Sequence, residues 1–126
     1  MGKRILIVDD EPSIIEYLTQ ALVGKGYVVD GASSCLDAIV SIAGTRYHSL
    51  ILDLLLPDVD GLLLYDQVKR LDGDLARRTI FITGSAESHP LFHRATQTSL
   101  PILPKPIPAS RLFEILESQC AGPCCA

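Results

Sequence analysis

The chain has 126 residues, of which 48% are hydrophobic and 21% are charged, and its formal net charge is −4. This length suits one domain whose core can fold without disulfides or a structural metal. The acidic balance gives no indication of electrostatic binding to nucleic acid or to an anionic membrane. The sequence contains no apolar stretch of about 18 residues and no signal-peptide pattern, so we expect a cytoplasmic protein without a membrane segment.

Short apolar segments alternate with amphipathic ones along the whole chain. The apolar segments predict strands at residues 4–8, 27–29, 49–52, 79–83 and 101–103. Apolar side chains at helical spacing predict helices at about 12–23, 34–43, 62–71, 87–97 and 108–119. This alternation predicts an α/β domain with a doubly wound, five-stranded parallel sheet and five helices on both faces.

One carboxylate, Asp53, ends a strand that is otherwise aliphatic. Burying an acid there is unfavourable unless a cation lies close to it. Ligands of parallel sheets bind at the carboxyl ends of the strands, so residues that end other strands are expected to share a crevice with Asp53. These residues are Asp9 and Asp10 after the first strand, Thr83 at the end of the fourth, and Lys105 after the fifth.

The residue types in this crevice favour one kind of chemistry. Oxygen ligands without His or Cys favour Mg²⁺, with Mn²⁺ as a substitute. The ammonium group of Lys105 suits phosphate oxygens, and the hydroxyl of Thr83 can donate a hydrogen bond to an anion formed on Asp53. Together these groups predict phosphoryl transfer to an aspartate.

These motifs are similar to those of a known family. The matching pieces are residues 7–12 (IVDDEP), residues 53–61 (DLLLPDVDG), residues 82–84 (ITG) and Lys105–Pro106. On them, the chain resembles the receiver domain of bacterial two-component response regulators. The resemblance implies a receiver domain over residues 1–120, with a flavodoxin-like fold and strand order 2-1-3-4-5.

The resemblance also implies how the acids act. Asp53 would accept a phosphoryl group from a sensor histidine kinase or a histidine phosphotransfer protein. Asp10 and Asp53, with the backbone carbonyl of Leu55, would bind Mg²⁺, and Asp9 would assist through a bound water. The domain would catalyse only its own phosphorylation and dephosphorylation, and otherwise would not be an enzyme.

Further implied roles concern the read-out of phosphorylation. Lys105 would contact the acyl phosphate, Thr83 would turn toward it, and the Lys105–Pro106 peptide would be cis. The family usually has Tyr or Phe where this chain has Ile102, and an aliphatic side chain cannot make the aromatic rotamer switch. Pro90 also disturbs the fourth helix. We therefore expect a modified surface of fourth helix, fifth strand and fifth helix to contact a downstream protein effector.

Leu55 and Ser85 flank the expected approach of the water that would hydrolyse the phosphoryl group. Leu55 cannot hydrogen-bond that water, so we expect slow self-dephosphorylation. Leu55 also stands where Mg²⁺-dependent aspartyl-phosphate phosphohydrolases place a second Asp, which argues against that alternative. A nucleotide-binding domain is disfavoured because no Gly-rich loop follows the first strand. The chain could also be a receiver fragment of a longer regulator with an output domain.

Four cysteines remain. Cys35 lies in a helical pattern and is expected to be a small side chain that is buried or half-buried. Three more, Cys120, Cys124 and Cys125, could bind zinc or oxidise, but no His or second Cys pair completes a tetrahedral set. We expect residues 121–126 to be a flexible tail.

Overall fold

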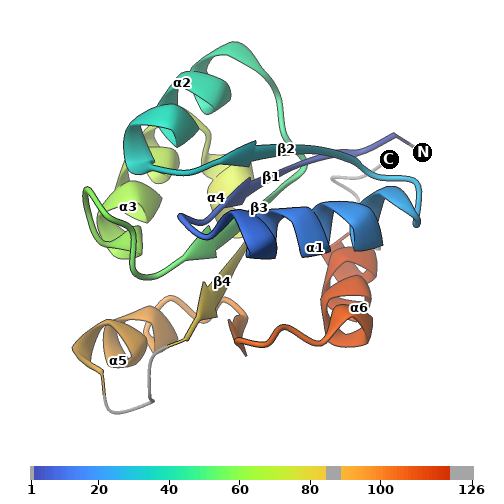
Figure 1. Cartoon of the computed structure of the whole chain (residues 1–126). Coiled ribbons are helices and arrows are strands. Elements are labelled where there is room, and N and C mark those ends of the chain that lie inside the picture. The colour runs from blue at the N-terminus through green and yellow to red at the C-terminus, as the bar shows by residue number, and fades with distance from the viewer. Residues whose placement is uncertain (1, 85–88, 120–126) are drawn as a thin grey trace.

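A computed structural model of the chain describes residues 2–84 and 89–119 (Figure 1). The strands it contains are β1 (Arg4–Val8), β2 (Val28–Ala32), β3 (Ser49–Asp53), β4 (Thr79–Thr83) and β5 (Ile102–Pro104). The helices are α1 (Pro12–Val23), α2 (Cys35–Gly44), α3 (Gly61–Leu71), α4 (Gly73–Arg77), α5 (Pro90–Thr96) and α6 (Ala109–Gln119). All strand pairs are parallel, and the order β2-β1-β3-β4-β5 confirms the predicted doubly wound fold.

Helices cover both faces of the sheet, and each face has its own apolar cluster. On one face, Leu18 and Leu22 of α1 and Leu112 and Leu116 of α6 pack against the strands. On the other face, side chains from α2, α3, α4 and α5 form the second cluster. Every residue of β3 and β4 is buried, which explains why these strands read as continuous apolar runs.

The structure has six helices within the described residues, so the prediction of five was wrong. The additional element is α4, which follows α3 after a single residue, Asp72. The side chain of Asp72 accepts a hydrogen bond from the backbone N–H of Leu75 at 3.1 Å and caps α4. As a result, α5 and α6 correspond to the predicted fourth and fifth helices.

The predicted end of the second strand was too early. β2 continues through Asp30 and Gly31 to Ala32, and it pairs with β1 along its full length. The carboxylate of Asp30 is satisfied by the guanidinium of Arg4 at 3.1 Å and by the hydroxyl of Tyr47 at 2.7 Å. Pairing and these two partners outweigh the low strand propensity of Asp and Gly.

Other boundaries differ by about one residue, as is usual for element ends. Within the described residues α5 begins at Pro90, where proline suits the first helical turn. The predicted start of this helix at residue 87 lies outside the described residues. Cys35 is buried as predicted, whereas Cys120, Cys124, Cys125 and the tail lie outside the described residues. None of the helices described here could span a membrane, because each is too short or too polar.

The last described residue, Gln119, lies at the edge of the sheet where the strands begin. Its side chain accepts a hydrogen bond from the hydroxyl of Ser49 at 2.6 Å and donates one to the carbonyl of Arg78 at 3.3 Å. Ser49 starts β3, and Arg78 directly precedes β4. The end of α6 is thereby attached to the amino-terminal ends of the two central strands.

Candidate functional site

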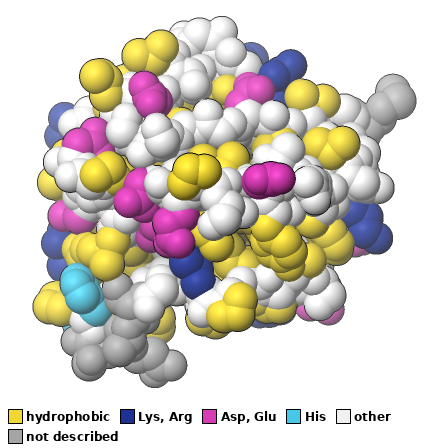
Figure 2. All heavy atoms as spheres, in the orientation of Figure 1, with side chains coloured by type: hydrophobic (Ala, Val, Ile, Leu, Met, Phe, Trp, Pro, Cys, Tyr) yellow, Lys and Arg dark blue, Asp and Glu magenta, His cyan; other side chains and the backbone are white. Residues whose placement is uncertain are grey.

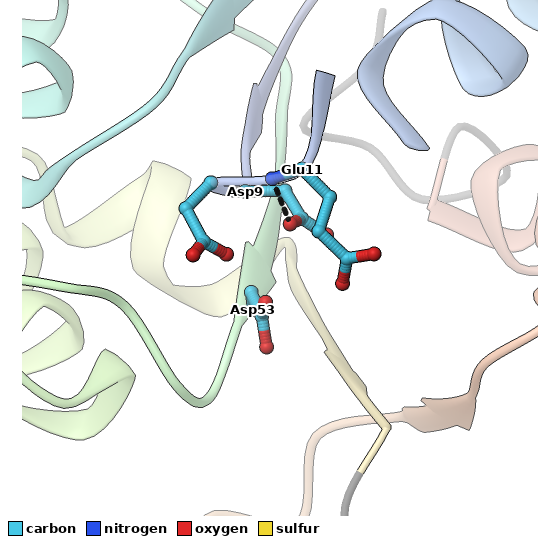
Figure 3. A group of neighbouring side chains, drawn as sticks. Asp9, Glu11 and Asp53 are labelled. Atoms are coloured by element: carbon cyan, nitrogen blue, oxygen red, sulfur yellow. Dashed lines mark hydrogen bonds between the residues drawn. The ribbon is translucent and has the colours of Figure 1, made fainter. Parts of the chain in front are cut away.

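The strand ends bring the predicted site residues together. Asp53 is the last residue of β3, Asp9 follows β1 directly, and Thr83 ends β4. The register pairs Val8 with Leu52, so β1 and β3 end side by side. Figure 3 shows Asp9 and Glu11 on the segment that follows β1, and Asp53 at the end of β3.

Four carboxylates form the centre of the site. Asp9, Asp10, Glu11 and Asp53 each offer an oxygen, and these atoms lie within 4.8 Å of one another. Asp9 is fully buried and Asp53 is 4% exposed, whereas Asp10 and Glu11 reach solvent. A set of oxygen donors that is partly buried and partly open matches the ligand preference of Mg²⁺.

Lys105 places one cation against three of these acids. Its Nζ lies 2.9 Å from Asp9 Oδ2, 2.9 Å from Glu11 Oε1 and 3.0 Å from Asp53 Oδ2. Burial lowers the pKa of Lys105, but the adjacent carboxylates of Glu11, Asp9 and Asp53 outweigh burial and raise it above its usual value. The ammonium group is therefore charged at any physiological pH.

The negative charge of the cluster is only partly balanced. Asp9 Oδ2 is buried and meets Lys105 at ion-pair distance, but it has no well-aligned hydrogen bond among the described residues. Asp9 Oδ1 accepts a hydrogen bond from the backbone N–H of Glu11 at 2.9 Å. A buried carboxylate oxygen with spare acceptor capacity beside three more acids is a donor set that a divalent cation would complete.

Asp53 is held in place from both of its carboxylate oxygens. Oδ1 accepts a hydrogen bond from the backbone N–H of Leu55 at 3.1 Å, and Oδ2 faces Lys105. Burial, with a smaller contribution from the nearby Asp9, raises the pKa of Asp53 to about 6, although the hydrogen bonds from Leu55 and Lys105 act in the opposite direction. Ionisation of Asp53 is therefore less favourable in this position than in water, and a second cation would offset that cost.

The loop after Asp53 is fixed by short backbone contacts. The N–H of Leu54 donates to the carbonyl of Ile82 at 3.0 Å, and the N–H of Gly61 donates to the carbonyl of Leu54 at 2.7 Å. A Cβ atom at Gly61 would lie 2.3 Å from the carbonyl oxygen of Asp53. This close approach explains the glycine, since no larger residue fits there without moving the backbone.

Sequence reasoning missed two residues near the site. Glu11 was seen only as part of a motif, yet it pairs with Lys105. Asp58, in the loop after Asp53, accepts hydrogen bonds from the backbone N–H groups of Cys35 at 3.1 Å and Leu36 at 3.4 Å. These bonds lower the pKa of Asp58 and join the loop to the start of α2.

The structure also describes Thr83, Ile102 and the Lys105–Pro106 peptide. Thr83 is buried, and its carbonyl accepts a hydrogen bond from the N–H of Lys105 at 2.9 Å. Ile102 starts β5 and packs, half-buried, against the cluster beneath α2 to α5. The Lys105–Pro106 peptide bond is cis. Ser85 lies outside the described residues.

A cavity of about 320 Å³ opens at this edge of the sheet and is lined by Asp10, Glu11, Asp53, Leu55, Gly84 and Lys105. The fold and the site together define a doubly wound α/β domain with a carboxylate and lysine site at the carboxyl ends of its strands. The family model for the response regulator receiver domain matches residues 5–117, and the chain belongs to this family. It is thus a receiver domain of the two-component type.

Individual relatives agree with this assignment. The transcriptional regulatory protein TcrA of Mycobacterium tuberculosis is 35% identical over 69 residues, which are 55% of this chain and 27% of that protein. The response regulator MprA of Mycobacterium ulcerans is 37% identical over 75 residues, 60% of this chain and 32% of that protein. The matched part spans about a third or less of these relatives.

Among solved structures, a CheY-like receiver domain protein from Methanospirillum hungatei superimposes with a TM-score of 0.83. It is 27% identical, and the match covers 94% of this chain and 97% of the other. The architecture is therefore shared over nearly the full length of both chains.

Proposed function

We propose that this receiver domain accepts a phosphoryl group on Asp53 from the phosphohistidine of a sensor histidine kinase or of a histidine phosphotransfer protein. A carboxylate oxygen of Asp53 would attack phosphorus, a new O–P bond would form, and the N–P bond would break toward the imidazole. The observation that supports this most directly is the buried Asp53 with Lys105 Nζ at 3.0 Å. An ammonium at that distance can hold a phosphoryl oxygen as it arrives.

The donor set also fits Mg²⁺, with Mn²⁺ as a substitute. Asp10 and Asp53, with the backbone carbonyl of Leu55, would hold the ion, and Asp9 would assist through a bound water. When bound, the ion would neutralise negative charge on the transferring group. The spare acceptor capacity of buried Asp9 Oδ2 supports this assignment.

Lys105 and Thr83 have separate roles in this proposal. Lys105 now contacts three carboxylates, and it would exchange part of these contacts for the oxygens of the acyl phosphate. Thr83, at the end of the neighbouring strand, would donate its hydroxyl hydrogen to the same group. The conformational change that follows phosphorylation would reach Ile102 without the rotamer change of an aromatic side chain, because Ile102 is aliphatic.

The phosphoryl group is expected to be long-lived. Leu55 is 43% exposed at the mouth of the site, and its side chain offers neither a donor nor an acceptor to a hydrolytic water. A half-life of seconds without a phosphatase would contradict this expectation. Replacing Leu55 with Asn adds a polar group at the same place and should shorten the lifetime.

The proposed partners are a kinase or phosphotransfer protein upstream and a protein effector downstream. The effector would contact the face formed by α5, β5 and α6, without direct binding of the domain to nucleic acid or membrane. The matched relatives are much longer than this chain, so the domain would also suit a regulator with an attached output domain.

Mass spectrometry after incubation with acetyl phosphate and Mg²⁺ tests the chemistry. We expect one added phosphoryl group, which is absent in Asp53→Asn and retained in the matched control Asp66→Asn on exposed α3. Addition that survives in Asp53→Asn would contradict the proposal. Steady multiple turnover of p-nitrophenyl phosphate would instead favour a phosphohydrolase.

A further inference from the structure

A second, larger cavity lies between α1 and α2 at the carboxyl end of β2. Its volume is about 610 Å³, and it is formed by the first turns of α1, the end of β2 and one side of α2. Asp9 and Asp10 line its inner end, so it adjoins the phosphoacceptor site, but Asp53 and Lys105 do not line it. We refer to it as the α1–α2 groove.

The groove has an apolar floor that continues onto an exposed side of α2. Ile15, Ala32 and Val40 line it. Val40 is 65% exposed, and Leu36, one turn before it on the same helix, is 67% exposed. These two large aliphatic side chains, one turn apart on the exposed side of α2, extend the apolar surface beside the groove, and exposed apolar surface beside a groove favours an interaction site.

The rim of the groove is acidic. Asp10, Glu16 and Asp37 surround the apolar floor, and all three are exposed. No Lys, Arg or His is among the described residues that line the groove. Asp10 and Glu16 also form no ion pair with any described residue, in contrast to Asp9, which shares Lys105. Figure 2 shows acidic side chains beside hydrophobic ones across this face.

The apolar floor and the acidic rim together determine which kind of partner would fit the α1–α2 groove. We infer that the α1–α2 groove docks an amphipathic helix of a protein partner, with aliphatic side chains facing the groove and Lys or Arg side chains on both sides of them. The aliphatic side chains would cover Ile15 and Val40, while the cations would pair with Glu16 and Asp37. This inference goes beyond the proposed phosphorylation, because it needs neither Mg²⁺ nor a phosphoryl group.

Binding of a synthetic helical peptide tests this inference. The probe is a peptide of about 14 residues with Leu at helical a/d spacing and Lys elsewhere, compared with a matched peptide that carries Glu in place of Lys. Both are titrated into the unphosphorylated, metal-free chain, and amide chemical shifts are followed by NMR. We expect the Lys peptide to shift residues 12–16 and 33–41 and the Glu peptide to leave them unchanged.

Variants separate the groove from general attraction to an acidic protein. Glu16→Gln combined with Asp37→Asn, and separately Val40→Ser, should each weaken binding of the Lys peptide at least about tenfold. The matched pair Asp66→Asn with Glu117→Gln removes the same charge from α3 and α6 and should leave binding unchanged. Circular dichroism verifies that each variant is folded.

Four outcomes would overturn the inference: no binding of the Lys peptide, equal binding of the Glu peptide, shifts spread evenly over the surface, or an equal loss in the control pair. None of them depends on Asp53, so a domain that is phosphorylated but does not bind the peptide refutes the groove alone. A domain that binds the peptide but is not phosphorylated refutes the proposed function alone.

Discussion

Gly61→Ala should be one of the most damaging small substitutions in this domain. The methyl group would lie 2.3 Å from the carbonyl oxygen of Asp53 and 2.9 Å from Cα of Leu54. Both neighbours are backbone atoms, so no side-chain rotation can relieve the overlap. Ordinary contact begins at 3.4 Å, and the loop after Asp53 would therefore have to move by about 1 Å.

The size of the effect follows from two opposing contributions. Overpacking of a dense site costs about 1–3 kcal/mol, and the upper end applies where backbone must move. Alanine is a better helix former than glycine by up to about 1 kcal/mol, and Gly61 is the first residue of α3. We expect a net loss of about 2 kcal/mol in the free energy of unfolding, with slower phosphorylation because Asp53 is displaced.

Urea unfolding followed by circular dichroism measures the first effect, and acetyl phosphate labelling measures the second. Gly44→Ala is the matched control, because it also lies in a helix and a Cβ there meets nothing within 4 Å. That control should be neutral or up to about 1 kcal/mol more stable. A Gly61→Ala protein within about 0.5 kcal/mol of the wild type would refute the steric reasoning.

Three further predictions concern charge. Burial raises the pKa of Asp53 to about 6, so the free energy of unfolding of the metal-free protein decreases as the pH rises from about 4 to 6. Asp53→Asn should restore up to about 3 kcal/mol of this free energy at pH 7.5. Burial, together with the nearby charges of Arg78 and Lys3, lowers the pKa of His48 to about 4. Between pH 7 and 4 the unfolded chain therefore takes up a proton that the folded chain does not, and the free energy of unfolding falls as the pH decreases. His48→Gln should reduce this loss. Asp58→Asn should lower the urea midpoint and speed amide exchange at the start of α2.

The first two of these predictions have a control variant within the chain, and the third has an outcome that would contradict it. For Asp53, the exposed Asp66→Asn should leave stability at pH 7.5 unchanged, and an equal gain there would contradict the role of burial. For His48, the exposed His93→Gln should leave the pH dependence as it is in the wild type. For Asp58, unchanged exchange at Cys35 would show that its hydrogen bonds do not hold α2.

The sequence was sufficient to predict which residues meet at the carboxyl ends of the strands. Asp9, Asp53, Thr83 and Lys105 each follow or end an apolar segment, and parallel pairing brings the ends of such segments to one edge. The end of β2 and the additional helix α4 were harder to predict. Asp30 looks like a residue that stops a strand until Arg4 and Tyr47 are found beside it, and these partners are distant in sequence.

The sequence alone could not predict which carboxylates pair with Lys105. Several carboxylates compete for Lys105, and the distances that decide the pairing depend on side-chain rotamers in the folded state. The contact between Asp58 and α2 spans 23 residues, and an Asp after a proline is equally typical of an ordinary turn. Such contacts leave no short-range pattern in the sequence, so they can be identified only in the folded structure.

The attachment of Gln119 to Ser49 and Arg78 has a consequence for signalling geometry. Ser49 and Asp53 are the two ends of the same strand, and four residue steps along a strand span roughly 13 Å. Gln119 therefore lies at the edge of the sheet opposite Asp53. If Asp53 is phosphorylated as proposed, the length of β3 separates the modified carboxylate from the end of α6. A change at Asp53 would have to reach it as a shift of whole elements, such as β5 and α6, across the width of the domain.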